Sequence, residues 1–157
     1  MDDMKNLFIC GFMGCGKSSM GQVLSAMTGK QFVDTDKTIE AREKMSIPEI
    51  FEEKGEDYFR EKELGLASEI LGMQNLIVAV GGGFMLHDGI GEIIKATGSS
   101  ILFIDESFEN CYERIKDSDR PLVKGKSKDE LKALYDERKE RYLSIATEAI
   151  NPNEMFG

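Results

Sequence analysis

Apolar runs alternate with amphipathic segments along the whole chain. Four of the runs predict β-strands, at residues 7–10, 31–36, 76–80 and 101–104. Apolar residues at helical spacing predict helices that end near residue 28 and that cover residues 36–44, 56–72, 90–97, 111–116 and 127–147. Strands that alternate with helices predict a single α/β domain, in which helices cover both faces of a parallel sheet.

Two helix starts in this pattern carry a local signature. Ser46 and Glu49, and again Ser127 and Glu130, have the spacing of a capping box, in which each side chain binds the other residue's backbone N–H. The sequence before the last helix, DSDRPLVKGK at residues 117–126, is polar and contains Pro and Gly. We predict a mobile loop there.

The composition is that of an ordinary folded protein and argues against several classes. Of the 157 residues, 41% are hydrophobic and 31% are charged. No apolar run reaches the roughly 20 residues that a membrane span needs, and the first residues, MDDMKN, lack the basic start of a signal peptide. We therefore expect a cytoplasmic protein that does not bind membranes. The three cysteines lack CxxC spacing, which argues against both a disulfide framework and a zinc site.

The formal net charge is −9, and no dense block of Lys and Arg is present. This argues against a partner that is a nucleic acid, because proteins that bind nucleic acids normally carry a basic patch. Individual Lys and Arg residues can still hold a small anion in a cleft. The sequence has no heptad seam either, so we expect a monomer.

The sequence GFMGCGKS at residues 11–18 fits the G-x-x-x-x-G-K-[ST] pattern of a phosphate-binding P-loop. It lies between the first predicted strand and the first helix, as a P-loop does; a chance glycine-rich turn is the other interpretation. In a P-loop, backbone N–H groups surround the phosphates, Lys17 reaches the β- and γ-phosphates of ATP, and Ser18 binds Mg²⁺. The predicted ATP contacts are Gly14, Cys15, Gly16, Lys17, Ser18 and Ser19.

A second Mg²⁺ ligand has two candidates. Asp105 ends the apolar run ILFID, as a metal-binding Asp does in many P-loop proteins. Asp34 lies at the carboxyl end of the second strand, where ligands bind in open α/β sheets. Asp34 and Asp36 are two residues apart, so they would share one side of an extended segment. Asp105 is otherwise a strand-ending turn residue, and Asp36 otherwise caps the helix that follows.

Several charged side chains lie at positions where an apolar residue is expected. Arg60 and Glu63 fall on the apolar side of helix 56–72, and Arg138 lies among the apolar residues of the last helix. Buried charges need partners. Arg60 and Glu63 pair with each other or line a site, and Arg138 forms a buried ion pair or binds an anionic substrate. Arg120, in the loop, is either a solvated charge or part of a lid over transferring phosphates.

Three consecutive glycines, Gly81, Gly82 and Gly83, follow the apolar run at residues 76–80. They remove three side chains from the end of a buried strand, where glycine weakens packing. A sharp turn with positive φ explains any one of them. Close approach of a ligand to the backbone explains all three together.

With these residues assembled, the sequence resembles the shikimate kinase family. The matching elements, in family order, are GFMGCGKS, DTD at residues 34–36, FREKE at 59–63, GGG at 81–83, RPLV at 120–123 and ER at 137–138. The resemblance implies a three-layer α/β/α domain over residues 1–157 with a mainly parallel five-stranded sheet. It also implies a substrate-binding helical segment at about residues 36–62 and a lid at about residues 114–127. The implied reaction, a step of aromatic amino-acid biosynthesis, transfers the γ-phosphoryl group of ATP to the 3-hydroxyl of shikimate.

The resemblance assigns roles around the acceptor. Arg60 and Arg138 would bind the carboxylate of shikimate, while Asp36 would bind its ring hydroxyls and act as the base. Glu63 would orient Arg60 or a water molecule. The backbone of Gly81–Gly83 would lie against the substrate ring, with Gly82 as the best contact candidate.

The resemblance also assigns roles around the nucleotide. Asp34 would act near Mg²⁺, Lys17 and Arg120 would offset charge on the transferring group, and Arg114 would stack on adenine. Family members continue into a final strand and helix near the adenine. The last residues here, TEAINPNEMFG at 147–157, are too short for that helix, so the final strand is expected to be vestigial or replaced.

Two other functions compete with this interpretation. A related small-molecule kinase, for example one that acts on gluconate, would share the P-loop and the lid. A catalytically weak nucleotide-binding protein is supported only by the short carboxyl-terminal segment.

Overall fold

Five parallel strands form one sheet in the computed structural model, in which residues 6–156 are described. The strand order is β2-β3-β1-β4-β5. The strands are β1 (Asn6–Cys10), β2 (Gln31–Asp34), β3 (Leu76–Ala79), β4 (Ser100–Ile104) and β5 (Glu148–Ile150). The parallel α/β sheet predicted from the alternating pattern is therefore confirmed.

The centre of the sheet is β1, which pairs with β3 on one side and with β4 on the other. Phe8 lies opposite both Val78 and Ile101 in these ladders, and all three side chains are buried. Strands that are covered on both faces need apolar residues at every position. This explains why β1, β3 and β4 read as continuous apolar runs and not as alternating ones.

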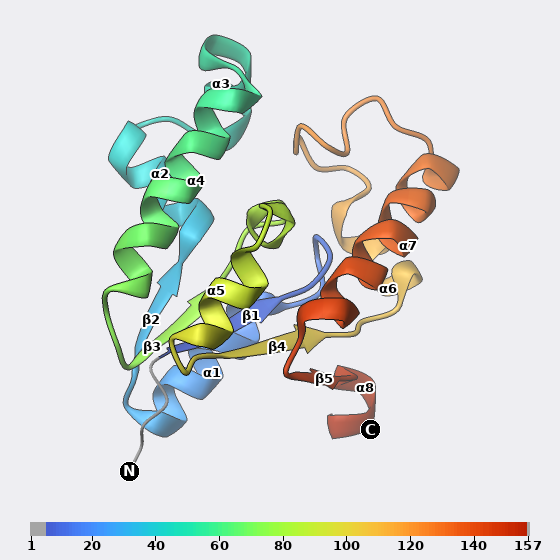
Figure 1. Ribbon diagram of the computed structural model, residues 1–157. Coiled ribbons are helices and arrows are strands. Elements are labelled where there is room, and N and C mark those ends of the chain that lie inside the picture. The colour runs from blue at the N-terminus through green and yellow to red at the C-terminus, as the bar shows by residue number, and fades with distance from the viewer. Residues whose placement is uncertain (1–5, 157) are drawn as a thin grey trace.

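Helices complete the layers on both faces of the sheet (Figure 1). They are α1 (Lys17–Thr28), α2 (Thr35–Glu43), α3 (Ile47–Lys54), α4 (Glu56–Leu71), α5 (Ile90–Ala96), α6 (Phe108–Ile115), α7 (Lys128–Ile145) and α8 (Pro152–Phe156), with the 3-10 turn η1 (Phe84–Leu86). In Figure 1, α2, α3 and α4 stand together at one edge of the sheet, and α7 lies across from them. None of the described helices is long and apolar enough to cross a membrane.

Two hydrophobic cores lie on the two faces of the sheet. Because side chains alternate along a strand, Phe8 faces one core and its neighbour Ile9 faces the other. The first core includes α4 and α5, and the second includes α6 and the P-loop. The helix α7 contributes to both, with Tyr142 in the first core and Leu131 in the second.

The predicted helix starts and ends are close to those observed, with two corrections. Both capping boxes are present, at Ser46 and at Ser127. The second strand, however, ends at Asp34 and not at Asp36. The Asp34 side chain accepts a hydrogen bond from the N–H of Lys37, so it is the N-cap of α2, and Asp36 lies in the first helical turn. The capping role considered for Asp36 thus belongs to Asp34.

The carboxyl-terminal segment also departs from the expectation. A final strand, β5, pairs with β4 in parallel, with Phe103 opposite Ala149. A helix of five residues, α8, follows it. The final strand is thus short, with three residues, but it is not replaced, and a short helix follows it in place of a long one.

Candidate active site

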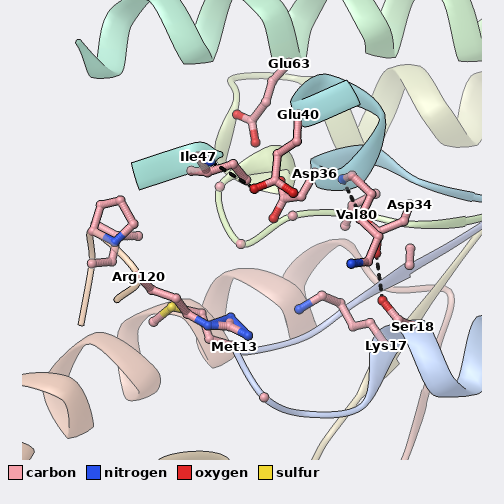
Figure 2. Close-up of a pocket in the computed structure, with 18 of the residues that line it drawn as sticks. Met13, Lys17, Ser18, Asp34, Asp36, Glu40, Ile47, Glu63, Val80 and Arg120 are labelled. Carbon is pink, nitrogen blue, oxygen red and sulfur yellow. Dashed lines mark hydrogen bonds between the residues drawn. The ribbon is translucent and has the colours of Figure 1, made fainter. Parts of the chain in front are cut away.

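A cavity of about 480 Å³ lies at the carboxyl ends of β1, β2 and β3. Its size is typical of a small-molecule site. Most of the side chains and glycines predicted for the site line it, namely Gly14, Cys15, Gly16, Lys17, Ser18, Ser19, Asp34, Asp36, Arg60, Glu63, Gly81, Gly82, Gly83 and Arg120. Figure 2 shows the carboxylates of Asp36, Glu40 and Glu63 on one side of this space and Lys17 on the other. Arg114 and Arg138 are not among the lining residues.

The P-loop connects β1 to α1 in the predicted place. Gly14 and Gly16 have φ angles of 80° and 98°, in the left-handed region that glycine adopts without strain. The ammonium group of Lys17 donates to the carbonyls of Gly11 and Phe12, at 3.0 and 3.3 Å. These contacts hold the ammonium beside the loop, where phosphate oxygens of a nucleotide would be bound.

Cys15 lies within the P-loop but is buried, with 3% of its surface exposed. Burial raises the pKa of its thiol above the ordinary value of 9.0. The thiolate is the reactive form of cysteine. The Cys15 side chain is therefore a packing residue of the second hydrophobic core.

Ser18 and Asp34 bring two side-chain oxygens together in the lining of the cavity. The Ser18 hydroxyl donates to Asp34 Oδ2 at 2.8 Å, although the two residues belong to different elements (Figure 2). Mg²⁺ is usually held by one or two protein oxygens together with water and substrate phosphates. A hydroxyl and a carboxylate beside a P-loop lysine fit this ion.

Asp105, the other candidate for a metal ligand, lies outside the cavity. Its carboxylate pairs with the ammonium of Lys139 at 3.1 Å, and it is not a lining residue. Its backbone N–H donates to the carbonyl of Ile150 at 2.7 Å, next to the β4·β5 ladder. Asp105 is thus a strand-ending residue that joins two elements.

Asp36 is a carboxylate with an unusual environment. Burial raises the pKa of its carboxyl group from 3.8 to about 6, and nearby Glu63 adds to the rise, while Lys17 opposes it. A group with a pKa close to the working pH is suited to accept a proton from a hydroxyl. Asp36 therefore has the properties of a candidate base, and it lines the cavity.

The three glycines after β3 make room for the site's own side chains. The N–H of Phe84 donates to the carbonyl of Gly81 at 3.2 Å and closes a turn. None of Gly81, Gly82 and Gly83 has a positive φ, so the explanation by a turn with positive φ is wrong. A β-carbon at Gly81 would overlap the carboxylate of Asp36, and one at Gly83 would overlap the guanidinium of Arg60. What lies close to these glycines is therefore a pair of protein side chains, and the approach of a ligand to their backbone stays a prediction.

Arg60 and Glu63 pair with each other and also line the cavity, so the two sequence interpretations hold together. Arg60 Nη1 donates to Glu63 Oε1 at 2.8 Å, and Glu56 holds the other side of the same guanidinium at 3.1 Å. A residue that the sequence analysis missed, His87, lies 3.0 Å from the same Glu63 oxygen. The Glu63 side chain is completely buried.

Arg138 is buried beside Gly82, a residue that lines the cavity, and 5% of its surface is exposed. Its Nη1 donates to the carbonyl of Gly82 at 3.1 Å, and its Nε has no hydrogen-bond partner. Among the residues that the structure describes, no carboxylate lies within ion-pair distance of it. The expected alternative, a buried structural ion pair, is therefore wrong. An uncompensated buried cation is costly unless an anion is bound beside it.

Arg114 lies on the outer side of the P-loop. Its Nη1 donates to the carbonyl of Gly14 at 2.7 Å, and its Nη2 contacts Glu106 Oε1 at 3.3 Å. Burial acts to raise the pKa of Glu106, but hydrogen bonds from Asn110, Ser107 and Asn153 hold it below its ordinary value. The Glu106 carboxylate thus connects α8, through Asn153, to Arg114, the residue that is expected next to adenine.

Two further groups of lining residues escaped the sequence analysis. Glu40 Oε2 accepts a hydrogen bond from the N–H of Ile47 at 2.9 Å, which joins α2 to the start of α3. Phe51 and Phe59 pack against each other with ring centres 5.3 Å apart and ring planes tilted by 53°, and both line the cavity. Phe59 belongs to the apolar stripe of α4 beside Arg60, which was the available signal; Glu40 lies in a charged helix and gave none.

Comparison with known proteins points to one family. A sequence profile described as shikimate kinase matches residues 13–155. A shikimate kinase of Persephonella marina is 39% identical over 163 residues, which cover 98% of both chains. A solved shikimate kinase of Acinetobacter baumannii in complex with shikimate superposes with a TM-score of 0.86 and 30% identity, over 94% of this chain and 83% of that one. A gluconokinase of Sinorhizobium meliloti shares the fold alone, with a TM-score of 0.56 and 14% identity over 96% of this chain and 84% of that one.

Proposed function

The chain belongs to the shikimate kinase family, and we propose that it transfers the γ-phosphoryl group of ATP to the 3-hydroxyl of shikimate. The products are shikimate 3-phosphate and ADP. The nucleotide site is the P-loop with Lys17 and Ser18, and the acceptor site is the adjoining part of the cavity between α4 and the glycines. Both parts belong to one continuous cavity, as direct transfer between two bound substrates requires.

The observation that carries the proposal for the acceptor is the buried guanidinium of Arg138. It has no carboxylate partner in the described part of the chain, whereas the guanidinium of Arg60 already has two. A substrate carboxylate would supply the missing partner, and a planar guanidinium suits a carboxylate better than an ammonium does. A phosphoryl acceptor that carries a carboxylate is therefore favoured over a neutral polyol.

Asp36 is the proposed group that receives the hydroxyl. Its raised pKa of about 6 leaves it mostly ionised at neutral pH and able to accept a proton. Because phosphoryl transfer needs little covalent help, its larger effect is to orient the 3-hydroxyl towards the γ-phosphorus. Gly81 leaves the space in which this carboxylate lies.

Charge on the transferring group is offset from two sides. Lys17 approaches from the P-loop, and Arg120 lies across the cavity in Figure 2. Ser18 and Asp34 would hold Mg²⁺, which supplies further positive charge to the phosphates. We propose that residues 36–62 form the substrate-binding segment and that the loop within residues 114–127 acts as a lid that brings Arg120 to the phosphates and excludes water.

The proposal is tested by ADP release from Mg-ATP with and without shikimate, and with gluconate as a second acceptor. We expect shikimate-dependent release that falls about 100-fold or more in Asp36→Asn, the usual range for a lost acid–base group. Release that depends on gluconate would favour the other small-molecule kinase. Equal background release in every condition would overturn the kinase proposal in favour of a nucleotide-binding role.

A further inference from the structure

The only histidine of the chain, His87, lies at the back of the proposed acceptor site. It directly follows η1, and its Nε2 is 3.0 Å from Glu63 Oε1, across 24 residues of sequence. Its side chain is 15% exposed. Phosphate binding at the P-loop needs no such residue, so the contact requires another explanation.

The two oxygens of the Glu63 carboxylate differ in their hydrogen-bond partners. Oε1 accepts from both Arg60 Nη1, at 2.8 Å, and His87 Nε2. Oε2 is buried and has no partner within the described residues. An ionised carboxylate can only accept hydrogen bonds, and such a contact requires that His87 carries a proton on Nε2. Together the two donors fix the plane of the carboxylate and leave one oxygen available.

His87 itself is held from two sides through its backbone. Arg141, on α7, donates its Nη2 to the carbonyl of His87 at 3.2 Å and its Nε to the carbonyl of Met85 at 3.0 Å. The N–H of Ile90, the first residue of α5, donates to the same His87 carbonyl at 3.2 Å. These hydrogen bonds fix the backbone of His87, and the imidazole extends from it to Glu63 on α4. A flexible exposed histidine would not fix the position of its partner.

We propose that His87 is a positioning residue for the acceptor site, and this rests on the proposed function. It holds Glu63 so that Arg60 keeps its orientation and Oε2 faces the acceptor side of the cavity. There Oε2 accepts a hydrogen bond from a hydroxyl of the bound hydroxy acid or from a water held by it. The effect of His87 falls on binding of the acceptor and leaves the nucleotide site unchanged.

Kinetics of two variants and a control test this role. His87→Leu removes the donor, whereas His87→Gln keeps an N–H at a similar reach from the backbone. A hydrogen bond to a charged group is worth enough to change affinity by about tenfold or more. In His87→Leu we expect KM for shikimate to rise about tenfold, while kcat and KM for ATP stay within about twofold of wild type. In His87→Gln we expect KM for shikimate to return most of the way to the wild-type value. Asp88→Asn, an exposed neighbour, should behave as wild type.

Either of two kinetic outcomes would overturn the role. One is an unchanged KM for shikimate in His87→Leu while the wild type turns over normally. The other is an equal rise of KM for shikimate in His87→Leu and His87→Gln, accompanied by a lower melting temperature in both variants. That result would make His87 a structural residue. A wild-type protein without shikimate-dependent turnover would instead overturn the proposed function, and with it the acceptor named here.

A second readout is independent of turnover, because a single histidine gives unambiguous imidazole signals. In ¹⁵N-labelled protein without ligands, we expect a proton on Nε2, with ring shifts that change in Glu63→Gln. Addition of shikimate should move these signals, and addition of ATP alone should leave them nearly unchanged. Signals that are indifferent to both the Glu63 substitution and shikimate would show that the imidazole does not act through Glu63.

Discussion

The carboxylate of Asp36 occupies the space that a β-carbon at residue 81 would fill, so Gly81 and Asp36 fit only as a pair. The same relation joins Gly83 to Arg60. In both cases a glycine after the end of β3 leaves space for a charged side chain on a helix that is distant in sequence. Substitution at either glycine should therefore disturb the acceptor site through the displaced side chain.

Alanine at these glycines should weaken acceptor binding. In Gly83→Ala the new methyl group forces Arg60 from its place against Glu63, and in Gly81→Ala it displaces Asp36. We expect KM for shikimate to rise about tenfold or more in Gly83→Ala and kcat to fall in Gly81→Ala. KM for ATP should change little in either variant. Steady-state kinetics with each substrate varied in turn would measure this.

Gly65→Ala is a matched control for those two variants. Gly65 lies on the exposed face of α4, and nothing lies within 4 Å of a β-carbon placed there. Alanine should leave activity unchanged and stabilise the helix by about 0.5–1 kcal/mol. Equal activity losses in all three variants would argue against a specific role of the strand exit.

The pH dependence of the reaction should report the ionisation of Asp36. Its pKa of about 6 means that protonation at lower pH removes the group that accepts the hydroxyl proton. We expect kcat/KM for shikimate to be flat above pH 7 and to fall about tenfold per pH unit below about pH 6. Recovery of activity on return to pH 7.5 separates this effect from acid unfolding. A profile that stays flat down to pH 5 would contradict it.

Asp36→Asn should stabilise the protein while it inactivates it. The pKa of Asp36 is higher in the folded chain than in the unfolded chain, so ionisation costs folding free energy at every pH above about 6 and costs nothing below about 4. The asparagine variant should gain roughly 2–3 kcal/mol at pH 7.5, and the gain should vanish towards pH 4. Denaturant unfolding at both pH values measures it, with the exposed Glu61→Gln as the control. An identical gain at both pH values would show that ionisation is not its cause.

Mg²⁺ dependence should follow the Ser18–Asp34 pair. Chelation by EDTA should abolish turnover, and added Mg²⁺ should restore it. Asp34→Asn keeps a good N-cap for α2 but loses the charge, so we expect normal stability with about a tenfold higher Mg²⁺ concentration at half-maximal activity. Ser18→Thr retains a hydroxyl and should be much less affected than Ser18→Ala. Unchanged Mg²⁺ dependence in Asp34→Asn would remove Asp34 from the metal site.

The short carboxyl-terminal helix should influence nucleotide binding through Glu106. Asn153 Nδ2 donates to Glu106 Oε2 at 3.0 Å, and Glu106 in turn contacts Arg114. We expect Arg114→Ala to raise KM for ATP about tenfold and Asn153→Ala to raise it a few-fold, since its effect is indirect, with KM for shikimate unchanged. Glu154→Gln, on the same helix, is the control. A change in KM for shikimate instead would place this cluster in a different role.

The sequence pattern was a reliable guide where local physics decides the structure. Strands buried on both faces must be apolar throughout, so β1, β3 and β4 stood out as runs. The P-loop is a contiguous motif whose glycines adopt the backbone angles that the motif needs. Both capping boxes depend on residues three apart in sequence, and both formed as predicted.

The parts that escaped prediction depend on contacts between distant segments. The partners of Gly81 and Gly83 lie on helices far away in sequence, so the glycines alone suggested a ligand. The pair of His87 and Glu63 has no local signature either. The strand β5 is short and has two exposed residues, Glu148 and Ala149, so it lacks the apolar run that marks a strand. Pairing with β4 alone defines it.

The helix α7 starts directly after the loop that carries Arg120 and reaches back to the glycines. Its residues Arg138, Arg141 and Tyr142 are spaced so that all three hydrogen-bond to the backbone between Gly82 and His87. Each residue of an α-helix turns the chain by about 100°. An insertion or deletion of one residue before Arg138 would therefore rotate these donors out of phase with the predicted lid. Substitutions on the exposed side of α7 should therefore be tolerated. The length of α7, by contrast, is constrained, because the helix must connect the loop of Arg120 to the backbone at Gly82–His87.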